Sequence, residues 1–157
     1  MHSPPPPSHL PTMKHIARVR ELLGEFAIEM IRRGDVHDAS KFTDVETGPL
    51  DAWQRIIDAE GQAPFGSDAY KRQIAVLKPM LRHHYKHNTH HPQHYENGID
   101  GMDLFDLVEM FFDWKAASER GGEGVMNLTS ACQIYDVSRQ LRSIFHNTAN
   151  RLGYRIS

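Results

Sequence analysis

The feature that constrains this chain most is the pair His37-Asp38, an imidazole and a carboxylate on adjacent residues between apolar-patterned segments. Both groups prefer water, and burying either one without a partner costs several kcal/mol. A divalent cation removes that cost, because neutral imidazole nitrogen and ionised carboxylate oxygen are both good ligands. His15 lies upstream, and six of the eleven histidines fall between His83 and His94. We therefore expect a fold built around a buried metal site.

The composition limits the classes of protein that fit. With 157 residues, 39% hydrophobic and 24% charged, the chain is long enough to bury a core as one soluble domain. A formal net charge of -2 argues against a dedicated nucleic-acid surface, which shows a basic surplus. The single Cys132 excludes an internal disulfide and a Cys-rich zinc module. We expect no secretion signal and no membrane contact, hence a cytoplasmic protein, in the host cytoplasm if a phage encodes it. The composition is compatible with a monomer or a homo-oligomer.

Apolar residues recur at three- and four-residue intervals, which predicts an all-α fold of five or six helices. We expect residues 1–11 to form an extended or disordered proline-rich arm and residues 12–157 to form one helical domain. The expected helices run from the N-cap Thr12 to Arg33, from 44 to 60, from the cap Ser67 through a kink or restart at Pro79, from 102 to 120, and from 128 to 152. Residues 61–66 and 121–124 are predicted to be loops.

Two histidines continue the apolar face of a predicted helix. His15 lies four residues before Val19; alone it would more often be a core histidine, but upstream of a His-Asp pair we favour ligation. After Pro79 the apolar face reaches His84 and then Asn88, which directs both side chains inward.

Three acids share one face of the otherwise apolar segment 102–120. Asp106, Glu109 and Asp113 recur at spacings of three and four residues. A solvated acidic face is the usual explanation, and metal ligation is the alternative. The sequence leaves these two interpretations equally weighted.

Several named sites are absent: there is no His-Glu-x-x-His helix, no phosphate-cradling glycine loop and no nucleophile elbow. The remaining pattern resembles the HD superfamily of metal-dependent phosphohydrolases, whose ligand order is His…His-Asp…Asp. The pattern consists of a first His, the His-Asp pair, a histidine cluster and a distal acid. Some members of that superfamily add two histidines and hold two metals. The resemblance implies an HD-like helical domain around a buried metal site.

A closer likeness is to an uncharacterised family of small HD-like proteins of bacteria and their phages, over roughly residues 13–120. It favours Asp113 over Asp106 as the distal acid. The matching positions are His15; His37, Asp38, Ser40, Lys41 and Glu46; His83, His84, Asn88, His90 and His91; and Glu109, Met110, Asp113, Ala116, Ala117 and Ser118.

The resemblance implies a metal-activated water that attacks a phosphomonoester or nucleotide. In this interpretation one divalent ion (Mn, Fe, Co, Zn or Mg) is held by His15, His37, Asp38 and Asp113. A second ion, or the substrate phosphate, is contacted by His84 together with His90 or His91. Further substrate contacts come from His83 and Asn88. Lys41 neutralises developing charge. Glu46 or Glu109 carries a proton or orients a ligand histidine. Two rivals remain: an HD-like diiron oxygenase, and a non-enzymatic, metal-stabilised binding protein.

Overall fold

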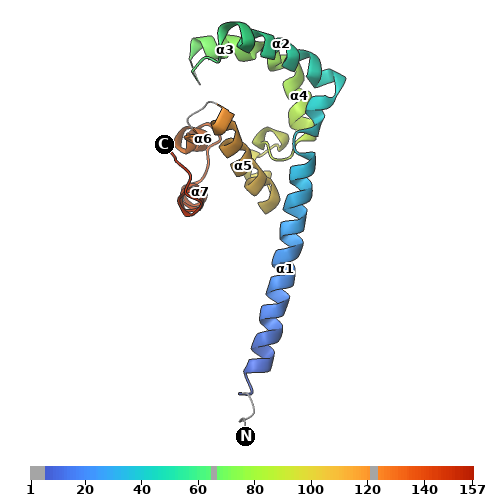
Figure 1. The fold of residues 1–157 in the computed structure, drawn as a ribbon, viewed down its shortest axis with the longest axis vertical. Coiled ribbons are helices and arrows are strands. Elements are labelled where there is room, and N and C mark those ends of the chain that lie inside the picture. The colour runs from blue at the N-terminus through green and yellow to red at the C-terminus, as the bar shows by residue number, and fades with distance from the viewer. Residues whose placement is uncertain (1–5, 65–66, 121–123) are drawn as a thin grey trace. The chain divides into compact units, whose positions relative to one another are not determined.

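The computed structural model describes residues 6–64, 67–120 and 124–157, and the chain is all-α, as its sequence predicts (Figure 1). In those residues no strand forms, and β-pairing is limited to one isolated bridge between Met126 and Ile156. The predicted loops at 61–66 and 121–124, and the first residues of the predicted arm, lie wholly or partly outside the described residues. The elements are α1 His9–Val36, η1 Ala39–Phe42, α2 Asp44–Glu60, α3 Asp68–Ile74, η2 Ala75–Leu77, α4 Lys78–His87, η3 Pro92–His94, η4 Gly98–Gly101, α5 Leu104–Arg120, α6 Leu128–Ile134 and α7 Arg139–Arg151, where η marks a 3₁₀ helix.

The chain divides into two compact units, Met1–His37 and Asp38–Ser157. Helix α1 forms the first unit and begins at His9, inside the stretch predicted to be the arm. Its N-cap is Ser8 and not Thr12, whose hydroxyl donates to the Ser8 carbonyl at 2.8 Å. Pro11 is tolerated because the first turn of a helix needs no amide donor there. The earlier start therefore follows from ordinary helix chemistry.

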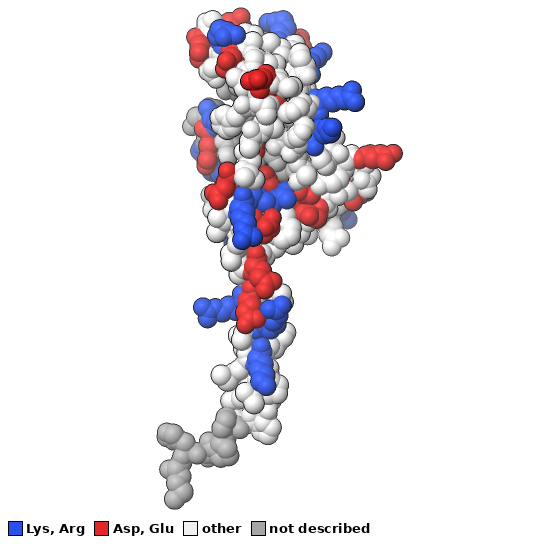
Figure 2. Space-filling view, turned by 90° about the vertical axis from the view of Figure 1, so that its right-hand side faces the viewer, with Lys and Arg blue, Asp and Glu red and all other residues white. Residues whose placement is uncertain are grey.

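Charged side chains of both signs lie along α1 among uncharged ones (Figure 2). Arg18 pairs with Glu21 at 2.9 Å, and Arg32 pairs with Glu29 at 3.8 Å. Both pairs are three residues apart and so support the helix locally. None of the helices in the described residues combines the length and the apolar content that a membrane crossing needs.

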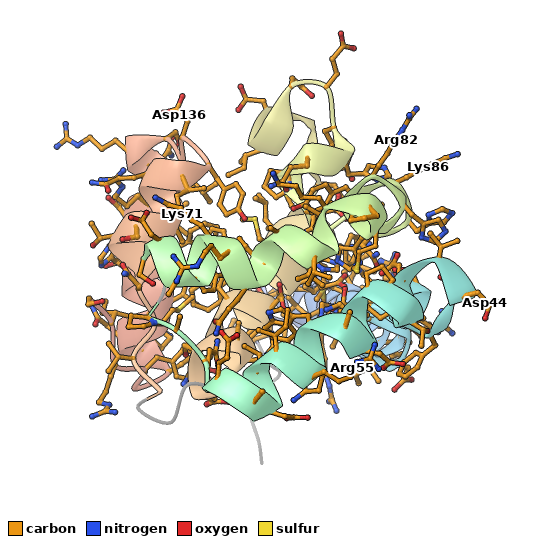
Figure 3. The ribbon with its side chains drawn as sticks, turned by 90° about the horizontal axis from the view of Figure 1, so that it is seen from above. Asp44, Arg55, Lys71, Arg82, Lys86 and Asp136 are labelled. Carbon is orange, nitrogen blue, oxygen red and sulfur yellow. The ribbon has the colours of Figure 1, made fainter. Side chains whose placement is uncertain are left out.

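In the second unit, α4 packs against α2 and η1 (Figures 1 and 3). These three elements carry four residues of the predicted site: Lys41, Glu46, His83 and His84. Helix α2 has the predicted bounds. Ser67 caps α3 by accepting the Tyr70 amide at 3.1 Å, and Pro79 lies in the first turn of α4, so the predicted restart is confirmed. Lys86 is exposed and His84 is buried, as the helical periodicity requires.

The apolar core of this unit lies among α5, α6 and α7. Its aromatic rings stack closely, with the Phe111 and Phe145 centroids 5.5 Å apart. The side chains are almost fully withdrawn from water, which makes burial of apolar surface the main stabilising term. The buried cluster consists of Met110, Phe111, Met126, Leu128, Cys132, Val137, Phe145 and Ala149.

The prediction of one continuous helix from 128 to 152 is wrong. The helix breaks between α6 and α7, where Asp136 has a left-handed backbone with φ of 49°. Ser138 then caps α7 by accepting the Leu141 amide at 3.3 Å. Asp tolerates the left-handed conformation and Ser is a preferred N-cap. The break was hidden in the sequence because Val137, inside it, is itself buried and prolongs the apolar stripe.

Candidate metal centre

The first part of the site is the tight turn that follows His37. Asp38 has a left-handed backbone (φ of 56°, ψ of 19°), and its carbonyl accepts the Lys41 amide at 2.9 Å to start η1. The turn brings the Lys41 ammonium onto Asp38 Oδ2. Non-glycine residues in this conformation are uncommon and concentrate at functional sites.

The second part is the C-terminal end of α4. Asn88 ends the helix, and its side-chain amide donates to the His84 carbonyl and to Ser40 Oγ, each at 2.7 Å. This amide therefore ties α4 to η1 and fixes the direction of the loop that carries His90 and His91. The predicted substrate contact of Asn88 stays untested, but its amide nitrogen already has a structural task.

Ligand atoms from these segments converge. His84 Nε2 lies 2.9 Å from His91 Nε2 and 3.5 Å from Asp38 Oδ1, and the three residues offer ligand atoms that are all within 4.8 Å of one another. His90 Nε2 lies 3.6 Å from the same Asp38 oxygen. Two imidazoles and a carboxylate at these separations form a donor set suited to a transition-metal ion.

Buried carboxylates stand behind the imidazoles. Glu46 is fully buried, and its two oxygens lie 2.7 Å from His83 Nδ1 and 2.9 Å from His84 Nδ1. Glu109 Oε1 lies 3.0 Å from His90 Nδ1. An ionised carboxylate only accepts hydrogen bonds, so each Nδ1 donates its proton, and in a neutral imidazole that leaves Nε2 with a lone pair. A histidine held in this way is the usual metal-binding arrangement.

The surroundings of Glu46 and His91 favour the protonation states that metal binding requires. Burial raises the pKa of Glu46, but hydrogen bonds from His83, Ser40 and His84 outweigh it and hold that pKa below its usual range. Burial, with smaller contributions from His90 and His84, lowers the pKa of His91 to about 3. Glu46 is therefore ionised and His91 neutral near neutral pH, as a proton acceptor and a nitrogen ligand must be.

The acids of α5 have different surroundings. Asp113 and His90 offer ligand atoms within 4.8 Å of each other, and Glu109 holds His90 from behind. Asp106 is 2% exposed and accepts hydrogen bonds from Thr89 Oγ1 and Tyr95 OH, both at 2.6 Å. Two of the three acids thus face the histidines, and Asp106 fastens the loop beside them to α5.

The remaining predicted residues are spread over both units. His83 is part-buried, bonded to Glu46 and stacked on His87 at a centroid distance of 4.1 Å. His15 belongs to α1, and His37 is the C-cap of that helix. The roles proposed for His15 and His37 stay predictions. Sequence reasoning gave no role to Ser40, although its position two residues after Asp38 was the available signal.

Comparison with known proteins assigns the chain to a family but identifies no reaction. Residues 8–151 match the sequence model of a family described as a family of unknown function (DUF5662). No curated protein and no solved structure matches the chain.

Proposed function

The chain belongs to the DUF5662 family of unknown function, and we propose that it is a metal-dependent phosphohydrolase. Its converging ligand atoms support the metal, and the likeness to the HD pattern supports the reaction. The substrate is a nucleotide or another small phosphate ester. The observation that carries the proposal is the convergence of His84 Nε2, His91 Nε2 and Asp38 Oδ1, with a buried carboxylate behind His84. Such a donor set fits one or two divalent ions, and its imidazole content favours Fe or Zn over Mg.

Each residue near the centre has a task that its contacts support. Asp38, His84 and His91 would hold the ion, and Asp113 with His90 would add ligand atoms on the α5 side. When bound, the ion would act as a Lewis acid that lowers the pKa of a water and polarises a phosphoryl oxygen.

The groups around the ligands complete the proposed mechanism. Lys41, already beside Asp38, is placed to offset negative charge on a phosphoryl group. Glu46 orients His84, and Glu109 orients His90 or accepts a proton. The ligand roles of His15 and His37, which belong to the first unit, rest on the likeness to the HD pattern alone.

The test combines metal content with a substrate panel. Elemental analysis of the purified protein should find at least one transition-metal ion per chain, and some phosphomonoester or nucleotide in the panel should release phosphate. Asp38→Ala and His37→Ala should each lose metal and activity together, whereas His146→Gln, a histidine of α7, should lose neither. Lys41→Ala should keep its metal and lose turnover. Full metal occupancy in Asp38→Ala would contradict the assignment.

A second candidate is a metal-stabilised binding protein without catalysis. It is favoured by the many polar side chains buried around α4, which a structural ion would also satisfy. In that case chelation would unfold the domain while no compound in the panel released phosphate. Iron as the only metal, with oxygen uptake, would instead point to the oxygenase reading.

A further inference from the structure

A hollow of ≈ 320 Å³ lies on the second unit, on the outer side of α4. Arg82, Tyr85 and Lys86 line it from α4, and Gln93 and His94 line it from η3. His94 Nδ1 lies 2.8 Å from the Tyr85 carbonyl oxygen, which fixes η3 against the helix. Figure 3 shows Arg82 and Lys86 projecting outward from α4 in similar directions.

Among the described residues of this unit, some basic side chains form ion pairs and others, Arg55 among them, do not. Lys71 pairs with Asp68 at 3.2 Å, and Lys115 pairs with Glu119 at 2.7 Å. Arg82 and Lys86 form no ion pair with a carboxylate in residues 6–64, 67–120 and 124–157. They are four residues apart on one helix face, where like charges repel each other. An anion in the hollow would relieve that repulsion.

The lining groups suit one kind of anion. A guanidinium presents a planar fork of donors that matches phosphate oxygens, and an ammonium adds a point charge. Two further lining residues carry neutral donors: Gln93, whose amide also bonds Tyr135, and Tyr85. A volume of ≈ 320 Å³ is at the small end of ligand pockets, which favours a small molecule over a polymer.

The hollow also adjoins the metal centre through Tyr85. The Tyr85 ring centroid lies 5.2 Å from that of His91 and 5.9 Å from that of His84. Tyr85 therefore forms a wall shared by the two sites.

We propose that this hollow is a binding site for the phosphate group of a small-molecule ligand, with Arg82 and Lys86 as its principal anchors. The site is separate from the metal centre, and phosphate binding there does not require that the protein hydrolyse anything.

Inorganic phosphate is the probe, titrated into the full chain as purified, at constant ionic strength and followed by NMR. Shifts should concentrate on the Gln93 side-chain amide and on His94. Arg82→Ala/Lys86→Ala should raise the dissociation constant about tenfold or more. The matched control is Arg55→Ala/Lys71→Ala, which removes the same two charges from α2 and α3 (Figure 3). It should change the constant less than about twofold, as expected for screened distant charges.

Three outcomes would overturn the proposal. Equal weakening in the two double variants would mean that only overall charge matters. An unchanged dissociation constant in Arg82→Ala/Lys86→Ala would show that these two residues do not bind the phosphate. Shifts centred on His84 and His91 would place the phosphate at the metal centre instead. The Asp38→Asn variant separates the proposed hydrolase function from the proposed phosphate site. It should abolish hydrolysis and leave phosphate binding in the hollow intact.

Discussion

The second unit contains two buried regions of opposite character. The region among α5, α6 and α7 buries apolar side chains, with Leu128, Cys132 and Ala149 at 0% exposure. The region among η1, α2, α4 and the following loop buries Glu46, His84 and His90 at 0–4% exposure. Among the described residues from η1 to α4, Met80 is the one buried apolar side chain.

This difference shows where each region obtains its stability. Apolar burial is favourable by itself at about 25 cal/mol per Å². Buried imidazoles and carboxylates lose their hydration free energy, and only hydrogen bonds or a bound cation offset that loss. The apolar region is therefore stabilised by burial itself, whereas we expect the polar region to depend on its hydrogen bonds and on the proposed ion.

Removing the metal should give the largest effect. We expect chelation to lower Tm by about 10 °C, because an ion present at about a thousandfold above its dissociation constant contributes about 4 kcal/mol. Hydrogen exchange should quicken first in α4 and the residue 88–91 loop, while α5–α7 stay protected. Uniform loss of protection, or an unchanged Tm, would break the distinction between the regions.

Leu128→Ala is the converse experiment in the apolar region. Leu128 is fully buried, so its truncation leaves a cavity and should cost about 3 kcal/mol in the free energy of unfolding. Metal content should stay that of the wild-type chain, because the core cluster that contains Leu128 includes none of the proposed ligands. Denaturant unfolding and elemental analysis on the same sample check both parts; loss of metal at unchanged folding would show that the regions are coupled.

The fold and part of the site followed from local sequence rules. The bounds of α2, the Ser67 cap, the restart at Pro79 and the inward direction of His84 all depend on periodicity or on single residues. These features are decided within a few helical turns.

What the sequence could not supply are contacts between distant segments. Glu46 meets His83 and His84 across 37 and 38 residues. The likeness to the HD pattern marked these residues, but it did not say which oxygen bonds which nitrogen. The role of Asp106 was missed for the same reason, since its partners Thr89 and Tyr95 lie in a loop without periodicity.

The acids of α5 provide a graded test of the polar region. Asp113→Asn should weaken metal binding most, because it removes a proposed ligand. Glu109→Gln removes only the partner of His90 Nδ1 and should cost about ten- to a hundredfold in affinity. Asp106→Asn should change affinity least. Titration of metal into the three apo variants gives the ranking, and a largest effect at Asp106 would require a new ligand set.

The smallest effect concerns the link between the two regions, where Tyr95 OH donates to Asp106 Oδ2. Tyr95→Phe removes one of several hydrogen bonds to that carboxylate and should cost about 1 kcal/mol. Burial and the Asp106 carboxylate raise the pKa of Tyr95 to about 12. An unfolded tyrosine titrates near about 10. Because the folded pKa is the higher one, the contribution of Tyr95 is complete below about pH 10 and is lost as the pH rises toward 12.

The wild-type chain and Tyr95→Phe should therefore differ in stability near pH 8 and converge above pH 11 or so. Other tyrosines with raised pKa values contribute equally to both proteins, so the difference isolates Tyr95. Urea unfolding at several pH values measures it. A difference that stays constant across this range would mean that the hydroxyl does not bond to Asp106, and that Thr89, not Tyr95, links the loop carrying His90 to that carboxylate.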